Sequence, residues 1–384
     1  MISSRAVALS VTLLSLLAAT PRQALALPTM VRLGYSECSA CHYSPQGGGP
    51  LNLYGRGIDQ AQSYRGGEYI PATSNLARIL TIGGRTTQEL RTVIQEQASV
   101  VTGGSVQTRL WPRLAYRNAT EIGRGLRVAA TITAEGATAI RPTLSYAPLS
   151  RAPSVFVNTA LLHYRPTKTL EFAAGRDQLP SGVNVPDLGL WTKSRNRLGY
   201  YDAPSQLKMF WTGRHVHVAP FAYMPGSNED SDDGEKGAGT VAEVVVGQDH
   251  AVLGMTVVNA TAALGDRQMM GGHARLGFGS WGIVAEHDFT KRTQVSAARA
   301  SFSQSTSYGQ LFWAPDDFLV ISGIAERLHV EQPFEERLVA GKLEIAARLA
   351  SQATLGISAR IERDQIRRRY SASLMLQAAL KTVP

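Results

Sequence analysis

The sequence predicts an all-β fold, in which about sixteen antiparallel strands close into a barrel that spans a membrane. From about residue 80 onwards, segment after segment alternates apolar and polar residues, and turn-forming residues separate the segments. A period of two residues is the signature of a strand whose two faces meet different surroundings. Many of these segments reach about ten residues, which is the length that a tilted strand needs to cross a bilayer.

Three segments show the alternation most clearly. In 125–135 one face is apolar, and it consists of Leu126, Val128, Ala130, Ile132 and Ala134. The opposite face is mostly polar and carries Arg127, Thr131, Thr133 and Glu135. The segments 351–362 and 370–380 repeat this pattern, and 106–117 places three arginines on one face, namely Arg109, Arg113 and Arg117.

A soluble β-sandwich would produce the same alternation, but three observations favour a barrel. No linker divides the chain into the domains that a sandwich of this size would need. Tight turns alternate with longer polar loops such as 225–239. Aromatic residues recur near predicted strand ends, as expected for interfacial girdles: Trp111, Tyr116, Tyr164, Trp211, Tyr223, Trp281, Phe289, Phe312, Trp313, Phe318 and Tyr370. The C-terminal Lys-Thr-Val-Pro lacks the aromatic residue with which many such barrels end.

The first 26 residues read as a secretory signal. Arg5 precedes an apolar stretch, 6–19, that is too short to span a membrane as a helix, and Ala24-Leu25-Ala26 fits a cleavage site. Removing this segment lowers the formal charge from +9 to +7. The arginines are spread along the chain, which suits an anionic membrane surface or the inside of a pore, and no nucleic-acid partner is expected of an exported protein.

Both cysteines of the chain lie in the sequence YSECSACHYSPQGGGPLNLYGR, residues 35–56. Cys38, Cys41 and His42 form the C-x-x-C-H pattern of c-type haem attachment, in which two thioethers anchor the ring and the histidine binds the iron. A disulfide between these cysteines is the alternative, although such a small loop would add little stability. The pattern predicts one covalent haem c with His42 as the metal ligand, in a segment at 27–78 that precedes a barrel at 79–384.

The residues after this pattern fit a small haem cover. Pro50, Leu51, Leu53 and Tyr54 supply apolar and aromatic surface, and Arg56 is long enough to reach a haem propionate. A flexible linker and a solvated charge are the alternatives for the glycine run 47–49 and for Arg56. The second axial ligand stays open among Met30, Met209, Met224, Met255, Met269, Met270, His163, His215, His217, His273 and His287.

Two other candidate metal sites are weaker. The acidic loop 227–236, SNEDSDDGEK, lacks the glycine that a calcium loop needs and reads as a solvated loop. His215 and His217 share one face of a predicted strand but have no third ligand nearby in the sequence.

The motif and the segment after it resemble the fused monohaem cytochrome c–porin family of outer-membrane iron oxidases. Members carry one C-x-x-C-H near the mature N-terminus, then a segment like P-x-L-N-x-F-G-R and a barrel of about sixteen strands. Here CSACH is followed by PLNLYGR, so that Pro50, Asn52, Tyr54 and Arg56 stand in a similar order. This sequence departs from the pattern in three ways: the glycine run, Leu51 directly after Pro50, and the short barrel. These departures are also compatible with a sister group that uses another electron donor or acceptor.

The resemblance implies electron transfer across the outer membrane through one haem held in or at the barrel. The haem-binding residues would be Cys38, Cys41, His42, Pro50, Asn52, Tyr54 and Arg56. The partners would be outer-membrane lipid, an extracellular donor such as Fe(II) and a periplasmic carrier, and lumen residues such as Arg109, Arg113 and Arg127 would hold propionates. Three alternatives remain open: a solute porin with a haem plug or sensor, electron export to an extracellular acceptor, and a soluble periplasmic cytochrome with a β-sandwich.

Overall fold

The structure is a computed structural model, and part of the N-terminal region and several loops lie outside the residues that it describes. The described residues are Met30, Tyr35, Cys41, His42, Leu51, Tyr54, Gly55, Ile58, 86–123, 125–136, 155–183, 190–199, 202–225, 234–247, 250–262, 265–294, 301–316, 318–331, 335–350 and 352–381. The predicted signal peptide, most of the predicted haem segment and most of the acidic loop 227–236 therefore lie outside them.

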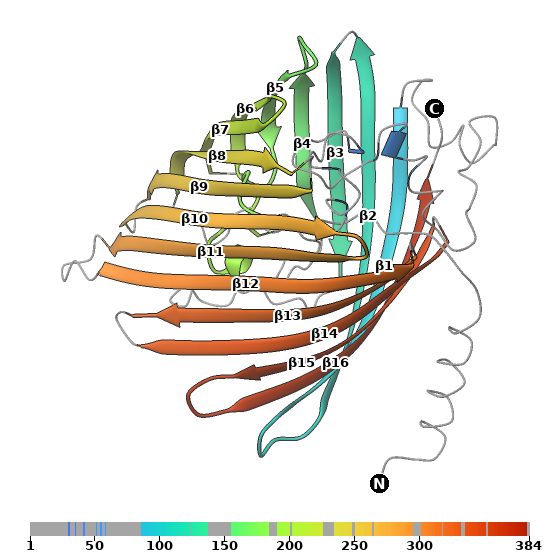
Figure 1. Cartoon of the computed structure of the whole chain (residues 1–384), viewed down its shortest axis with the longest axis vertical. Helices are drawn as coiled ribbons and strands as arrows, with labels where there is room; N and C mark the ends of the chain where they lie inside the picture. Colours follow the sequence, from blue (N-terminus) through green and yellow to red (C-terminus); the bar gives the residue numbers. More distant parts are fainter. Residues whose placement is uncertain are drawn as a thin grey trace.

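Sixteen strands form one closed barrel in which every pair of neighbours is antiparallel, as the sequence predicts (Figure 1). The strands are β1 (Thr86–Val101), β2 (Gln107–Gly123), β3 (Leu126–Glu135), β4 (Val155–Tyr164), β5 (Leu170–Arg176), β6 (Ser205–Thr212), β7 (Val216–Met224), β8 (Lys236–Val246), β9 (Ala251–Thr261), β10 (Gly265–Phe278), β11 (Trp281–Gln294), β12 (Ser301–Asp316), β13 (Leu319–Val330), β14 (Glu336–Ala350), β15 (Ala353–Arg363) and β16 (Arg368–Lys381). A short helix, α4 (Trp191–Ser194), lies between β5 and β6.

The strands follow one another around the barrel in chain order, and β1 closes it by pairing with β16. The connections at one end are short, such as 213–215 between β6 and β7 and 279–280 between β10 and β11. Longer connections at the other end include 177–204 and 225–235. In outer-membrane barrels short turns face the periplasm and long loops face the outside. Since β1 begins at the short-turn end, the segment that precedes it joins the barrel there.

The two faces of the wall carry the residues that the alternation predicts. On β3 the polar residues point into the lumen and are buried, with Thr133 at 0% and Glu135 at 7% exposed. On β16 the leucines point outward, and Leu374 and Leu376 are 47% and 46% exposed. An exposed apolar exterior around a polar interior is the arrangement that a lipid-facing barrel needs.

The aromatic girdle was predicted only in part. Residues such as Tyr164, Trp211, Phe289 and Tyr370 are exposed, and the stacked pair Trp281 and Trp313 lies near the short-turn end with ring centroids 5.7 Å apart. The girdle prediction is wrong for Trp111, Tyr223 and Phe312, because their positions in the alternation point them into the lumen, and for Phe318, which is buried. Among the described residues no helix is long and apolar enough to cross a membrane.

Candidate functional site

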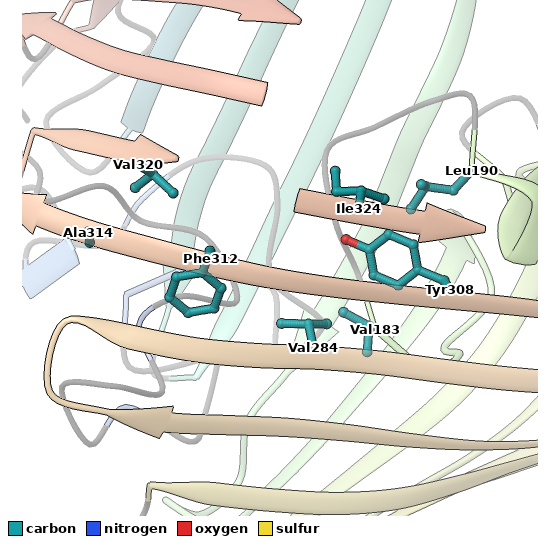
Figure 2. Packing of buried hydrophobic residues seen from close by; sticks show 8 residues of the cluster. All are labelled: Val183, Leu190, Val284, Tyr308, Phe312, Ala314, Val320 and Ile324. Atoms are coloured by element: carbon teal, nitrogen blue, oxygen red, sulfur yellow. The ribbon is translucent and has the colours of Figure 1, made fainter. Parts of the chain in front are cut away.

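The connection between β5 and β6 turns back into the barrel and lies against its inner wall. Of its described residues, 177–183 and 190–199 are here named the luminal segment. Four of its aliphatic side chains are at most 3% exposed: Leu179, Val183, Leu190 and Leu198. Burial of such a side chain is worth about 1.5–3 kcal/mol. Figure 2 shows Val183 and Leu190 pointing toward Val284, Tyr308 and Ile324 of β11, β12 and β13.

Asn196 is the hydrogen-bonding centre of the luminal segment. Its Nδ2 donates to Asp288 Oδ2 at 3.0 Å and to Thr306 Oγ1 at 2.9 Å. Its Oδ1 accepts from Thr290 Oγ1 at 3.0 Å and from Gln304 Nε2 at 2.7 Å. The side chain is 1% exposed, so these bonds satisfy it in the absence of water and fix the segment to β11 and β12.

Two glutamates of the wall hold the backbone of the luminal segment. Glu286 accepts from Lys193 Nζ at 2.9 Å and from the Val183 backbone N–H at 3.2 Å. Gly182 has φ +41, which favours glycine, and a β-carbon there would lie 1.8 Å from Glu286 Oε1, so any larger residue would displace this carboxylate. Glu326 accepts from the Trp191 backbone N–H at 2.8 Å.

A buried ion cluster holds the C-terminal part of the luminal segment. Glu235 lies just before β8 and accepts from Arg267 Nη2 at 2.6 Å and Arg292 Nη2 at 2.8 Å, while Arg197 approaches to 3.5 Å. Burial alone would raise the pKa of the Glu235 carboxyl, but these guanidinium groups outweigh burial and lower that pKa to about 2. Arg267 also donates to the Asn196 carbonyl at 2.6 Å, which ties the cluster to the segment.

The opposite wall carries ion pairs of its own. Arg91 and Arg117 face Glu89 at 2.5 and 3.6 Å, and their side chains are 24% and 16% exposed. The predicted propionate-binding residues Arg113 and Arg127 are held by Glu135 at 3.0 Å and Glu171 at 2.8 Å. Both guanidinium groups therefore already have carboxylate partners within the wall.

The described residues of the predicted haem segment form a compact fold-back. Cys41 is 7% exposed, and a β-carbon on Gly55 would lie 2.0 Å from the Cys41 carbonyl oxygen. His42 forms an isolated antiparallel bridge with Leu51, so the chain after the motif returns to it. The Tyr35 and Tyr54 hydroxyls lie 2.5 Å apart across the same region. Cys38, Pro50, Asn52 and Arg56 lie outside the described residues, as do the surroundings needed to place a haem.

The predicted candidates for the second axial ligand fall into two groups, one on the outward face of the barrel and one on the face that lines the lumen. Met209, Met224, Met255, Met270 and His287 lie on the outward face, which excludes them as ligands of a haem in the lumen. His163, His217, His273 and Met269 face the lumen. His163 Nδ1 lies 2.7 Å from Glu171, and Glu243 lies 2.9 Å from His273 Nε2 and 3.5 Å from His217 Nδ1.

The weaker candidate site at His215 and His217 does not form. His215 lies in the turn before β7 and is exposed, whereas His217 faces the lumen beside Glu243. Within the ranges that the structure describes, no group of three or more His, Cys, Asp or Glu side chains is arranged to hold a metal ion.

Strand periodicity in the sequence does not reveal the luminal segment, whose residues were not among the predicted functional ones. A signal was present: Leu179, Val183, Leu190, Trp191 and Leu198 are apolar, yet they lie in a glycine- and proline-containing connection. Such residues in a long loop indicate that the loop is covered by the rest of the fold.

Comparison with known proteins identifies the fold and no family. No family model matches the chain, and no curated protein does. Among solved structures, OprB of Pseudomonas putida is 9% identical with a TM-score of 0.59, covering 79% of this chain and 96% of its own. An anion-selective porin from Comamonas acidovorans is 10% identical (TM-score 0.56; 77% and 99% covered).

A loop-deletion form of OmpT, an outer membrane protein of Vibrio cholerae, is similar to the same extent. It is 10% identical with a TM-score of 0.57, and the match covers 77% of this chain and 99% of the other. At such low identity the likeness concerns the fold alone. The chain is an outer-membrane β-barrel with the fold of a sixteen-strand porin, and its outward face contacts membrane lipid.

Proposed function

We propose that this barrel is a channel for small hydrophilic solutes, narrowed from one side by the luminal segment. The observation that carries the proposal is the asymmetric lumen, in which one wall is covered by an anchored connection and the other presents charged side chains. A closed barrel of sixteen strands is wide enough to leave an aqueous passage. Because the wall fixes the segment through Asn196, Glu286 and Glu326, the constriction has a defined position.

We further propose that the channel favours anions. Arg91, Arg113 and Arg117 lie on neighbouring inner-face positions of β1 and β2, where the facing carboxylates are Glu89 and Glu135. Three guanidinium groups against two carboxylates leave a positive potential on the open wall. Such a potential concentrates anions inside a narrow passage and lowers their barrier to entry.

Single-channel recording from the mature, signal-free chain in planar bilayers tests this proposal. We expect stepwise conductance and, in a potassium chloride gradient, a reversal potential displaced toward that of chloride. Replacing Arg91 and Arg117 by Gln should move it toward zero, whereas Ser371→Ala on β16 should leave it unchanged. A barrel that inserts into the bilayer but conducts no ions would contradict the proposal that it is a channel.

A second candidate function, electron transfer across the outer membrane, is favoured by the C-x-x-C-H motif and its fold-back. Two thiols and an adjacent imidazole are the donor set of covalent haem c, and the chain returns onto Cys41 at Gly55. When bound, a haem supplies one-electron redox chemistry. Cys38 and Cys41 would anchor it, and His42 would bind its iron.

The segment that carries this motif joins the barrel at the short-turn end, where β1 begins. From that end it would exchange electrons with a periplasmic carrier, and an extracellular donor such as Fe(II), or an acceptor, would lie at the other mouth. The lumen-facing His163, His217 and His273 are the histidines of the described barrel that could complete the coordination.

Visible spectra of the purified outer-membrane fraction separate the two candidates. Covalent haem that is reduced by ferrous iron under anoxia, as by dithionite, supports electron transfer from iron. Reduction by dithionite alone removes iron as the donor, and the measured potential then decides between import and export. If haem is absent, the electron-transfer candidate fails while the channel stands. Ion flux that rises in Cys38→Ala/Cys41→Ala would instead assign the segment a plug function.

A further inference from the structure

The outward face of the barrel carries basic side chains toward the long-loop end. Arg327 on β13 lies opposite Val339 on β14, Val339 lies opposite Arg363 on β15, and Arg363 lies opposite Arg368 on β16. Directly paired residues of an antiparallel sheet share one face. Val339 and Ile361 are 48% and 53% exposed on that face, so the three arginines project outward and not into the lumen. These three arginines are here named the outer arginine row.

The outer arginine row differs from the lumen in having no carboxylate partners. In the lumen Arg91, Arg127, Arg267 and Arg292 each pair with a glutamate at 3.0 Å or less. Among the described residues, no carboxylate lies within ion-pairing distance of Arg327, Arg363 or Arg368. The carboxylates of the neighbouring loops are engaged locally, since Glu335 pairs with Arg337 and Asp364 accepts backbone N–H groups of its own turn.

The level of the row corresponds to the outer edge of the apolar band. Arg363 ends β15 and Arg368 begins β16, on either side of the hairpin turn 364–367 at the long-loop end. Directly below them on the same face lie Ile361 and Tyr370, which are a pair in the register and are 53% and 41% exposed. An exposed tyrosine and an isoleucine beneath arginines are typical of the boundary between lipid chains and headgroups, where long basic side chains extend to the headgroups.

We propose that the outer arginine row binds phosphorylated lipid headgroups of the outer leaflet, of the kind that carries phosphate on a sugar. Arginine offers a planar fork that matches phosphate in a bidentate manner. Adjacent strands lie about 4.8 Å apart, so Arg363 and Arg368 can hold one phosphate between them, and Arg327, two strands from Arg363, can reach a second phosphate of the same headgroup. The bound lipid would seal the barrel at β13–β16.

Lipid binding by the purified, detergent-solubilised mature protein tests the proposal. Native mass spectrometry would follow a titration with diphosphorylated lipid A, and the thermal unfolding midpoint would be recorded at each step. Arg327→Gln/Arg363→Gln/Arg368→Gln should bind at least about tenfold more weakly, which is one lost charge-assisted contact or more. The control Lys168→Gln/Arg214→Gln removes exposed cations from turns at the other end and should bind like the unmodified protein.

Each result decides for or against lipid binding by the outer arginine row. Weaker binding in the triple variant alone, together with no binding of the dephosphorylated glycolipid, supports it. Equal binding by the triple variant, or equal binding of the dephosphorylated lipid, overturns it. Complete displacement of the lipid by millimolar inorganic phosphate would show that the outer arginine row is a site for free phosphate, and it would also overturn the proposal of lipid binding. Should the triple variant fail to fold, the Lys-substituted triple keeps the charge and should bind with intermediate strength; unchanged binding there would contradict bidentate recognition.

Discussion

The two sides of the lumen obey the same alternation of residues but use it differently. Where the luminal segment covers β9–β13, inward residues such as Val258, Thr290 and Leu328 are 0% exposed. On β1, β2 and β16 several inward residues stay partly exposed, as the Arg91 side chain does at 24%, although Glu89 and Val93 are buried there. The covered wall therefore combines apolar packing with a dense buried hydrogen-bond network, whereas the open wall keeps more of its polar side chains partly exposed. The comparison teaches that the period of two sets the face of a residue, while its burial depends on what lies against that face.

The largest effect should come from Arg267, the cation at the centre of the covered wall. Its side chain is 1% exposed and contacts Glu235, Tyr223 and the Asn196 carbonyl. Arg267→Met removes the most buried of the three guanidinium groups around Glu235 and the donor to the Asn196 carbonyl, and it should cost about 3–5 kcal/mol in the free energy of unfolding. Urea unfolding in detergent micelles measures this, with Arg91→Met on the open wall as the matched control. A loss no greater than that of the control would remove the distinction between the walls.

Acid should weaken the covered wall through Glu235. The folded pKa of this carboxyl, about 2, lies below its ordinary value of 4.5, so its stabilisation is complete above pH 4.5 and disappears as pH falls toward 2. The shift corresponds to a contribution on the order of 3 kcal/mol. Unfolding midpoints measured across this range should fall more in the unmodified protein than in Glu235→Gln. Parallel pH curves for the two proteins would assign the acid sensitivity to other groups.

Asn196→Ala should release the luminal segment while leaving the barrel closed. The substitution leaves Asp288, Thr290, Thr306 and Gln304 without this partner, at a cost of about 1–3 kcal/mol. Limited proteolysis between β5 and β6 should become faster, and single-channel conductance should rise if the segment narrows the passage. Thr131→Ala on β3 serves as a control from outside the covered wall. Conductance that stays unchanged after the segment has been cleaved would show that it does not narrow the channel.

The smallest effect on stability is expected on the open wall. Arg91→Gln removes one partner of an ion pair in which the arginine is 24% and the glutamate 5% exposed. Arg117 still faces Glu89 at 3.6 Å, so the loss in the free energy of unfolding should stay below that of Asn196→Ala. The same change should alter anion selectivity measurably, because Arg91 faces the passage. A stability loss as large as that of Asn196→Ala would mean that the two walls are not energetically different.

Most of the barrel was predictable from the sequence, because strand faces repeat every two residues. The inward and outward residues of β3, β15 and β16 lie where the alternation places them. The luminal segment was missed, since Leu190 and Trp191 belong to no periodic element and their burial depends on β11–β14, far away in the sequence. Trp111, Tyr223 and Phe312 were assigned to the girdle from their nearness to strand ends, although the parity of their positions already pointed them inward. The haem assignment of Cys38, Cys41 and His42 stays a prediction.

The pairing of β1 with β16 has a consequence for how the molecule is made. Leu90 lies opposite Leu380, so the wall is complete only after almost the whole chain has been delivered to the membrane. Contacts between such distant residues make folding slow, and until then β1 and β15 present open edges on which other chains can assemble. A chain that stops before Arg368 would keep those edges permanently. Such a chain would be a substrate for chaperones and proteases of the envelope. Pairing of the fourteen-residue strand β16 with β1 is therefore the step that completes assembly of the barrel.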